Sequence, residues 1–380
     1  MSLGERVPKL RFPGFEGEWE ETKIGDLLTI YHGRDYKHLS SGNIPVLGTG
    51  GIITYVDTAL CNWSCTLIGR KGTIDKPQYM DQPFWSVDTL FYTKPKSDHN
   101  PLWQYYLFHT IPWKRYDDST GVPSLSASTI SSISVRIPKI SEQKIQANFF
   151  SLLDSRIAAQ RKLVELLKKH KRGVIEQIFR QHLELGNNSE KWNVVELRNL
   201  FSKVVRRNKD GRVKNVITNS AEFGLIPQRD FFDKSIAVEG NTDGYYIIHT
   251  GDFVYNPRKS TTAPFGPFNR YTGSEDGIIS PLYTCLVPNE KADPEYLAWY
   301  FRSTAWHRYV YDNGSQGARH DRVNMTDDLL LGIPVLLPPI AVQEKIAKCL
   351  NAIDARWSSA NKALAYLEDM KRGLLQQLFV

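Results

Sequence analysis

The chain has 380 residues, of which 41% are hydrophobic, 12% aromatic and 23% charged. A chain so rich in apolar and aromatic side chains can bury a core, which excludes wholesale disorder, and its length suits two ordinary domains. The formal net charge of +7 at pH 7 permits a polyanionic partner without requiring one.

Cysteine spacing and hydropathy limit the class of protein further. The four cysteines match neither a disulfide framework nor a zinc site. The N-terminus lacks the basic segment and apolar core of a signal peptide, and no apolar run reaches the roughly 18 residues of a membrane span. We therefore expect a soluble cytoplasmic protein.

In chain order, the first expected elements are short strands with glycine turns, in IPVLGTGGIITYVD (44–57). Helices are expected at 101–113 and 294–306, and a strand that ends at a loop is expected at 245–256. Each half therefore reads as an α+β domain that is followed by a long helix.

An internal duplication is the main feature of the sequence. Residues 137–179 align with residues 337–379 without a gap, at a constant offset of 200. Thirteen of these 43 positions are identical, which is far above chance for an ungapped match.

The match continues upstream with a drifting offset. Trp103 falls on Tyr296, and the stretch that starts at Leu67 pairs more weakly with the stretch that starts at Tyr255. Most of the added length of the second half therefore lies between Leu200 and Tyr255. A constant framework with variable interiors suits two modules of one architecture that have different targets.

The duplicated segments are expected to be long helices that pair with each other. Their apolar residues recur in steps of four and three, which is the heptad spacing of a coiled-coil seam. Gln160 and the paired Lys171 and Lys371 interrupt the seam, where a polar residue fixes register and partner at a cost in stability. The alternative is that each helix lies on its own domain. The predicted seam consists of Phe150, Leu153, Ile157, Val164, Leu167, Val174, Ile178, Leu350, Ile353, Trp357, Leu364, Leu367, Leu374 and Leu378.

The predicted fold class is α+β, with two tandem-duplicated α+β domains separated by two long helices that form an antiparallel coiled coil. The helices should be antiparallel because each follows its own globular half. The predicted divisions are 1–140 for the first domain, 141–183 for the central helix, 184–340 for the second domain and 341–380 for the C-terminal helix.

No catalytic constellation is visible in the sequence. The chain lacks a GxxxxGK phosphate loop, and its GTGG at 48–51 is not followed by the helix that a dinucleotide site requires. The histidines lack metal-ligand spacing, and no pair of acidic residues stands out as an acid–base couple. We therefore predict no catalytic residue, no metal and no cofactor in this chain.

Basic clusters are the candidate sites instead. The segment 203–214, KVVRRNKDGRVK, carries six basic residues against one aspartate and lies where the second half is longer. Basic pairs also follow two aligned strands, and GARHDRVN (317–324) is basic where its counterpart GVPSLSAS (121–128) is uncharged. A solvated loop is the alternative in each case. The predicted DNA-binding residues are Arg70, Lys71, Arg206, Arg207, Lys209, Arg212, Lys214, Arg258, Lys259, Arg319, His320 and Arg322.

The opening stretch PKLRFPGFEGEWEETKIGDLL (8–28) resembles the start of DNA-specificity subunits of type I restriction-modification systems. Three further stretches are similar to the recurring segments of that family: LIGRKGTIDKPQYMDQPFWSVDTLFY (67–92), GVPSLSASTISSISVRIPKISEQ (121–143) and RVNMTDDLLLGIPVLLPPIAVQEKI (322–346). The resemblance spans nearly the whole chain, and the order and duplication of these short motifs carry it. The second copy departs at AVQ (341–343), where the first has SEQ (141–143), at a helix start rather than at a reactive site.

The resemblance implies a non-catalytic subunit with two target-recognition domains, each of which reads one part of a bipartite double-stranded DNA target. The paired helices would set the spacer and dock two methyltransferase subunits, which bind S-adenosylmethionine and methylate adenine. Restriction subunits would join and use ATP and Mg, so these cofactors are expected on partner subunits. A scaffolding protein with two ligand-binding domains on a coiled-coil rod is the alternative, and an enzyme whose site the sequence hides is a third.

Overall fold

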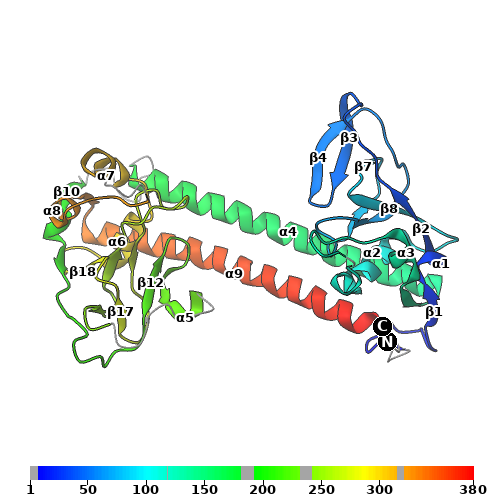
Figure 1. Cartoon of the computed structure of the whole chain (residues 1–380). Helices are drawn as coiled ribbons and strands as arrows, with labels where there is room; N and C mark the ends of the chain where they lie inside the picture. Colours follow the sequence, from blue (N-terminus) through cyan, green and yellow to red (C-terminus); the bar gives the residue numbers. More distant parts are fainter. Residues whose placement is uncertain (1–6, 118, 181–191, 232–241, 315–320) are drawn as a thin grey trace. The chain divides into compact units, whose positions relative to one another are not determined.

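The structure, a computed structural model, describes residues 7–117, 119–180, 192–231, 242–314 and 321–380. The chain divides into two compact units, whose elements are labelled in Figure 1. The first unit comprises Met1–Leu163 and Ala360–Val380, and the second comprises Val164–Ser359. Each unit therefore contains one part of each long helix.

The first unit is a mixed α and β structure. Its four-stranded antiparallel sheet has the order β2-β8-β5-β6, and a three-stranded sheet has the order β4-β3-β7. The first strand of the unit pairs with the strand that precedes the first long helix. The elements are β1 (Glu20–Lys23), α1 (Ile24–Leu27), β2 (Leu28–His32), β3 (Ser41–Gly48), β4 (Gly51–Val56), β5 (Cys65–Gly69), β6 (Gln78–Met80), β7 (Trp85–Ser86), β8 (Leu90–Pro95), α2 (Pro101–Thr110), η1 (Trp113–Tyr116), α3 (Ala127–Ser132), β9 (Ser134–Ile137) and α4 (Ile140–Phe179), whose first part lies in this unit.

The second unit repeats this plan. Its four-stranded sheet has the order β11-β18-β15-β16, and its first strand again pairs with the strand that precedes a long helix. The elements are β10 (Asn193–Glu196), η2 (Leu197–Asn199), β11 (Phe201–Lys203), β12 (Ile217–Ser220), β13 (Gly224–Pro227), α5 (Gln228–Phe231), β14 (Tyr246–Ile248), β15 (Phe253–Tyr255), β16 (Phe268–Arg270), β17 (Gly277–Ile279), β18 (Thr284–Pro288), α6 (Pro294–Tyr300), α7 (His307–Asn313), α8 (Asp327–Leu331), β19 (Pro334–Leu337) and α9 (Ile340–Leu378).

The strand register corrects the sequence alignment at one point. Leu67 lies opposite Tyr92 in the first unit, and Val254 lies opposite Cys285 in the second. Tyr92 and Cys285 occupy equivalent places because β8 and β18 end at equivalent prolines that face β2 and β11. Leu67 therefore corresponds to Val254, and the predicted match to Tyr255 is wrong by one residue. The sequence alignment superposes two Arg-Lys pairs, whereas backbone hydrogen bonds decide the real register.

Equivalent caps start the short helices that the sequence predicted. The carboxamide of Asn100 accepts a hydrogen bond from Trp103 N at 3.0 Å, and the carboxylate of Asp293 accepts one from Tyr296 N at 2.7 Å. A proline follows each cap at the first helical position, where its missing N–H costs nothing. In both helices an N-cap residue and a following proline therefore fix the first helical residue.

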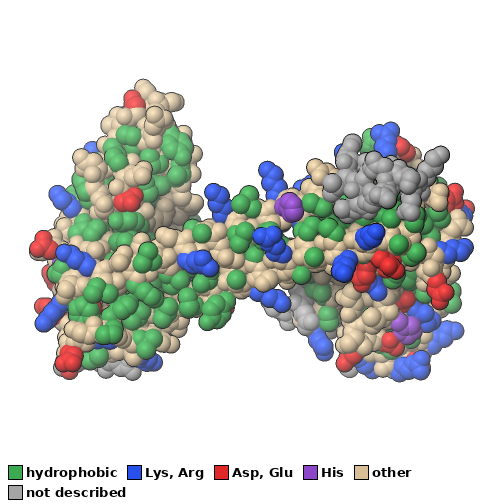
Figure 2. Space-filling view, turned by 180° about the vertical axis from the view of Figure 1, so that it is seen from behind, with side chains coloured by type: hydrophobic (Ala, Val, Ile, Leu, Met, Phe, Trp, Pro, Cys, Tyr) green, Lys and Arg blue, Asp and Glu red, His purple; other side chains and the backbone are tan. Residues whose placement is uncertain are grey.

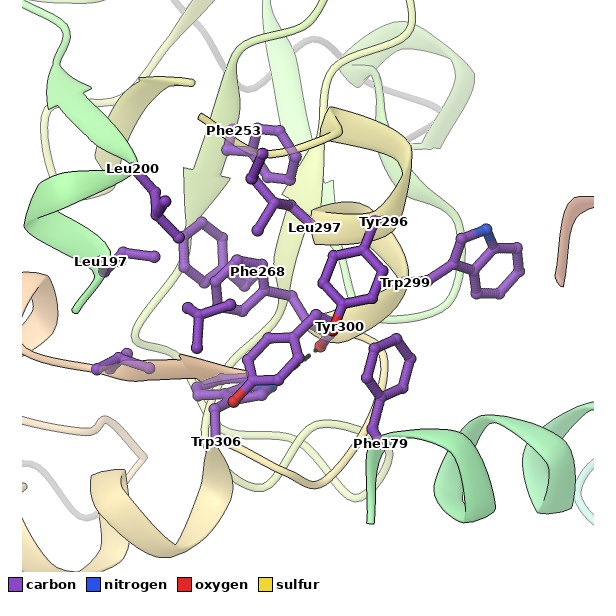
Figure 3. Packing of buried hydrophobic residues seen from close by; sticks show 14 of the residues in the cluster. Phe179, Leu197, Leu200, Phe253, Phe268, Tyr296, Leu297, Trp299, Tyr300 and Trp306 are labelled. Carbon is purple, nitrogen blue, oxygen red and sulfur yellow. Dashed lines mark hydrogen bonds between the residues drawn. The ribbon is translucent and has the colours of Figure 1, made fainter. Parts of the chain in front are cut away.

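Aromatic residues of the short helices and of the ends of the long helices form cores. In the second unit Phe179, at the end of α4, packs against Tyr296 and Tyr300 with ring centroids 5.5 Å apart in both cases, as Figure 3 shows. In the first unit Trp103 is fully buried and stacks on Phe379 at 5.6 Å. The ends of the long helices are thus built into the cores of the units.

Within each unit the two long helices run antiparallel. In the first unit Lys371 donates to Asp154 at 2.5 Å, and in the second Lys171 donates to Asp354 at 2.7 Å. These ion pairs are reciprocal, because both lysines and both aspartates are related by the offset of 200. Each lysine that interrupts the seam therefore has a partner on the other helix, which is how a polar seam residue can specify register.

All fourteen predicted seam residues are buried or half-buried. The predicted fold class is confirmed: the chain has two tandem domains of mixed helix and sheet, with a long central helix of 40 residues and a C-terminal helix of 39. The domain limits predicted from the sequence stay a prediction, since the compact units are divided inside the helices.

Candidate nucleic-acid interface

The first candidate, Arg70-Lys71, lies in a tight turn after β5. A Cβ on Gly69 would come within 2.1 Å of Thr73 O, and Gly72 has a φ of +87°, so glycine is needed at both places. The N–H groups of Arg70 and Lys71 donate to Thr89 O at 2.8 and 3.2 Å. Arg70 also donates to a backbone carbonyl at 3.3 Å, while the Lys71 side chain is exposed. Backbone hydrogen bonds hold the turn, which presents one lysine to solvent.

The equivalent turn of the second unit places Arg258 beside Arg322. The two residues face each other in an isolated antiparallel bridge, in the position that Lys71 and Ser124 hold in the first unit. Arg258 Nε lies 3.8 Å from an Asp321 carboxylate oxygen, and the Lys259 N–H donates to Asp321 O at 2.8 Å. The structure thus brings together three of the predicted basic residues.

Arg319 and His320 lie outside the described residues. Near them, the Arg322 Nε is buried without a hydrogen-bond partner among the described residues. Burial raises the pKa of the neighbouring Tyr283, and the positive charges of Arg258 and Arg322 act in the opposite direction. Arg258 and Arg322 therefore both lie close to Tyr283.

The first part of the basic segment 203–214 is committed to contacts inside the second unit. Lys203 pairs with Asp327, and Arg206 pairs with Asp252 while also donating to Ile247 O at 3.4 Å. Burial raises the pKa of the Asp252 carboxyl, although the N–H of His249 and the Arg206 charge act in the opposite direction. Arg206 therefore balances a buried acid, which the sequence could not reveal.

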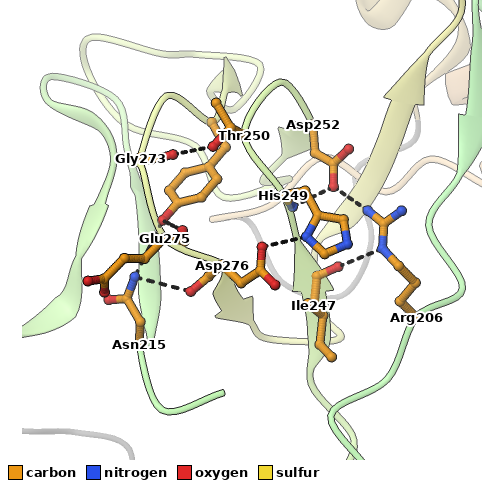
Figure 4. Close-up of polar contacts among 10 residues, drawn as sticks. Arg206, Asn215, Ile247, His249, Thr250, Asp252, Gly273, Glu275 and Asp276 are labelled. Carbon is orange, nitrogen blue, oxygen red and sulfur yellow. Dashed lines mark hydrogen bonds and ion pairs between the residues drawn. The ribbon is translucent and has the colours of Figure 1, made fainter. Parts of the chain in front are cut away.

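Figure 4 shows the polar network to which Arg206 belongs. His249 Nδ1 lies 2.6 Å from an Asp276 carboxylate oxygen, and the Asn215 side chain donates to Asp276 O at 3.4 Å. Next to this network, Arg207 lies 3.7 Å from the ring centroid of Tyr246 and donates to its hydroxyl at 2.7 Å. These contacts hold the start of the basic segment against β14.

The rest of the segment is a loop whose basic side chains point outward. Asn208 is fully buried, and its side chain both donates to and accepts from the backbone of Val213, at 3.0 and 3.2 Å. This closes the loop around Gly211, which has a φ of +61°. Lys209, Arg212 and Lys214 are exposed on it. Of the six basic residues, these three are best placed to contact phosphates.

One exposed feature, the hairpin of β3 and β4, is absent from the sites predicted from the sequence. Its second strand exposes Ile52, Ile53 and Tyr55, with exposed fractions of 56%, 53% and 50%. The only signal was the glycine-rich segment GTGGIITY, which the sequence identifies as strands and turns but not as a surface. The predicted sites were clusters of basic residues, and this hairpin segment carries no charge.

Two other kinds of site are absent from the part of the chain that the structure describes. It contains no group of three or more His, Cys, Asp or Glu side chains that could hold a metal ion. None of the helices in this part is long and apolar enough to cross a membrane.

Comparisons with known proteins show which family this chain is similar to. Residues 16–169 match the family described as type I restriction modification DNA specificity domain. The chain is 28% identical over 430 aligned residues to the type I restriction enzyme MjaVIII specificity subunit of Methanocaldococcus jannaschii, covering 99% of this chain and 93% of that protein. It is 25% identical over 342 residues to the putative MjaX specificity subunit of the same organism, covering 82% and 74%.

Among solved structures, the S subunit of a type I restriction-modification system from M. genitalium has a TM-score of 0.62 and 14% identity, over 98% of this chain and 99% of that one. A chain from a structure of type I restriction-modification complex assembly has a TM-score of 0.53 and 13% identity, over 95% and 97%. At such identities these two structures support the fold alone. The family match over residues 16–169 and the two curated relatives support the resemblance of this chain to DNA-specificity subunits of type I restriction-modification systems.

Proposed function

We propose that each unit reads one part of a bipartite double-stranded DNA target and that the helix pair sets the spacer between the parts. The observation that carries this proposal is a repeated framework with different surfaces. The sheet order β2-β8-β5-β6 recurs as β11-β18-β15-β16, while the loops around the sheets carry Lys71 in one unit and Arg258 with Arg322 in the other. A constant scaffold with variable polar loops suits readout of two unlike sequences.

The long helices would also dock two methyltransferase subunits, with restriction subunits joining the complex. On this proposal S-adenosylmethionine, ATP and Mg bind the partners, and the present chain contributes recognition rather than catalysis. The reciprocal pairs Lys171–Asp354 and Lys371–Asp154 support a helix pair of fixed register, which a spacer element requires. The site of action would be the cytoplasm, where the DNA and these subunits meet.

Selection of DNA from a random pool tests the proposal directly. The full chain, reconstituted with its methyltransferase partner, should enrich a split motif with a fixed unspecified gap. Salt-sensitive binding without an enriched motif would contradict sequence recognition. Absence of binding would favour a scaffold with ligands other than DNA.

Replacing Lys209 and Lys214 together by alanine should weaken binding to the selected duplex and to unrelated duplexes by the same factor. Removing one lysine–phosphate interaction lowers the slope of log K against log salt by about 0.9, so the double variant should lower it by about 2. The measurement is a salt titration of affinity by fluorescence anisotropy. The matched control is Lys291→Ala, which removes an exposed lysine of the same unit outside the loop. A change in the preferred motif would instead mean that the loop reads bases.

A further inference from the structure

The hairpin of β3 and β4 has an unusual surface for a soluble protein. Among the described strands β4 lies at the edge of the sheet β4-β3-β7, and three large side chains, Ile52, Ile53 and Tyr55, are at least half-exposed on it. An apolar edge strand invites pairing with other chains, and proteins usually protect such edges with charge or a cover. The exposure therefore indicates a surface with a function.

A bulge aims two of these side chains outward. Val46 of β3 faces Thr54, and the next residue, Leu47, faces Ile52, so Ile53 is an extra residue in β4. In a regular strand neighbouring side chains point to opposite faces, whereas a bulge breaks this alternation. Ile52 and Ile53 are consequently both exposed at the end of the hairpin. A Cβ on Gly48 would lie 2.8 Å from Ile53 Cδ1, so glycine leaves room for this arrangement.

Strand β6 and the Lys71 turn both approach the hairpin turn. The Gln78 side chain donates to Gly48 O at 2.8 Å, and a Cβ on Gly72 would lie 3.8 Å from Thr49 Oγ1. Gly72 N in turn donates to Pro123 O at 2.8 Å. The Lys71 turn thus lies beside the hairpin turn, and the loop of Val122, whose exposed fraction is 66%, contacts the Lys71 turn. We call the exposed side chains of Ile52, Ile53, Lys71 and Val122 the hairpin surface.

The hairpin surface carries one charge, the positive charge of Lys71, and no negative one. Residues 39–56 carry no charged side chain, Lys37 and His38 precede them, and the exposed carboxylates of Asp35 and Asp57 flank the stretch. An uncharged, narrow hairpin with an exposed lysine beside its turn can approach phosphates without repulsion. Figure 1 shows the hairpin extending away from α2 and α3, and Figure 2 shows hydrophobic side chains at the surface of this projecting part, at the upper left.

The second unit has the same hairpin with different residues. β12 and β13 pair in antiparallel fashion as β3 and β4 do. In the first unit β7 pairs in parallel with β3, and in the second Ile278 of β17 forms an isolated parallel bridge with Val216, the residue before β12. The turn of the second hairpin carries Glu222 and Phe223, the latter with an exposed fraction of 60%. A fixed backbone with a changed tip is expected of an element that distinguishes two targets.

We propose that the β3–β4 hairpin enters the DNA major groove and that Ile52 and Ile53 contact thymine methyl groups of one half-site. This inference rests on the proposed function and names the element that reads the first half-site. The major groove, about 12 Å wide, admits a two-stranded ribbon, and the thymine methyl group is the apolar feature of its floor. Lys71, beside the turn, contacts the adjacent phosphate.

The double variant Ile52→Ala/Ile53→Ala, in the full chain with its methyltransferase partner, tests the proposal. The probe is a duplex that carries the motif selected by the wild-type complex. The variant should bind this duplex about tenfold more weakly, because alanine is too short to reach the thymine methyl groups. Replacing thymine by deoxyuridine in one half-site removes the same methyl groups and should weaken wild-type binding severalfold. The variant should be insensitive to that replacement, since the two changes remove one interaction.

The second half-site and a second variant provide the controls. Deoxyuridine in the other half-site should affect the wild type and the variant equally. Val194→Ala removes an aliphatic side chain of 66% exposed fraction from β10 and should leave affinity unchanged. The wild-type response to deoxyuridine needs no variant, so a folding defect cannot hide the result.

Three outcomes would contradict the proposal. These are a wild type indifferent to deoxyuridine in both half-sites, a selected motif without A·T pairs, and a variant that loses its methyltransferase partner rather than DNA affinity. The last would make the hairpin surface a protein-binding surface. Failure of the wild type to select any motif would overturn the proposed function as well, so the two failures can be told apart.

Discussion

Inserting seven residues after Leu167 in α4 and seven after Leu367 in α9 is expected to lengthen the unspecified gap of the target by about three base pairs. Seven helical residues add about 10 Å, and one base pair spans about 3.4 Å. A heptad preserves the a/d seam, so the added length keeps the pairing. Both half-site sequences should stay as they are, because the insertions lie in the long helices and leave the sheets and loops of both units unchanged.

The two ion pairs make this insertion a more specific test of the helix pair than a change of length alone. In α4 the insertion lies between Asp154 and Lys171, and in α9 it lies between Asp354 and Lys371. Both partners of each ion pair therefore stay on the same side of the inserted sections. A matched insertion can therefore keep both pairs. An insertion in α4 alone shifts one helix against the other by about two turns and cannot keep both. It is the control, and it should destabilise the helix pair.

The measurement is motif selection with the inserted chain and its proposed methyltransferase partner. Affinity should fall even if the gap lengthens as expected, because three base pairs also rotate one half-site by about 100° around the duplex. An unchanged gap in the selected motif would rule out the helix pair as the spacer element.

The fold was predictable because its signals are periodic and repeated. Heptad spacing predicted two long helices, and duplication predicted two units of one architecture. Proline and an N-cap residue marked the starts of α2 and α6. Such patterns are local in sequence, so no knowledge of tertiary contacts is needed to read them.

The candidate site was less predictable because charge alone does not say whether a side chain is free. Arg206 and Lys209 look alike in sequence, but Arg206 meets Asp252, which is 46 residues away, while Lys209 faces solvent. The hairpin surface was not predicted for the opposite reason. Its exposure depends on a bulge at Ile53 that shifts the strand register, and no residue pattern in GTGGIITY specifies that shift.

Replacing Arg11 by alanine is expected to cost the first unit about 3–5 kcal/mol of its free energy of unfolding. Arg11 Nε and Nη2 donate to the two carboxylate oxygens of Glu142 at 3.0 and 2.8 Å, and the Glu142 side chain is fully buried in the first turn of α4. Without the guanidinium, a buried carboxylate has no charge to balance it. The helix N-terminus offsets only part of this cost.

The repeat itself supplies the compensating variant. At the position equivalent to Glu142 the second copy has Val342, which packs against the core of the second unit. The double variant Arg11→Leu/Glu142→Val should therefore recover most of the stability, because a well-packed apolar pair can replace a buried ion pair at little cost. Amide hydrogen exchange resolved by peptide measures the first unit separately from the second. Equal protection from amide exchange in the single and the double variant would mean that the lost stability comes from the missing packing of Arg11. It would not come from an unpaired buried charge.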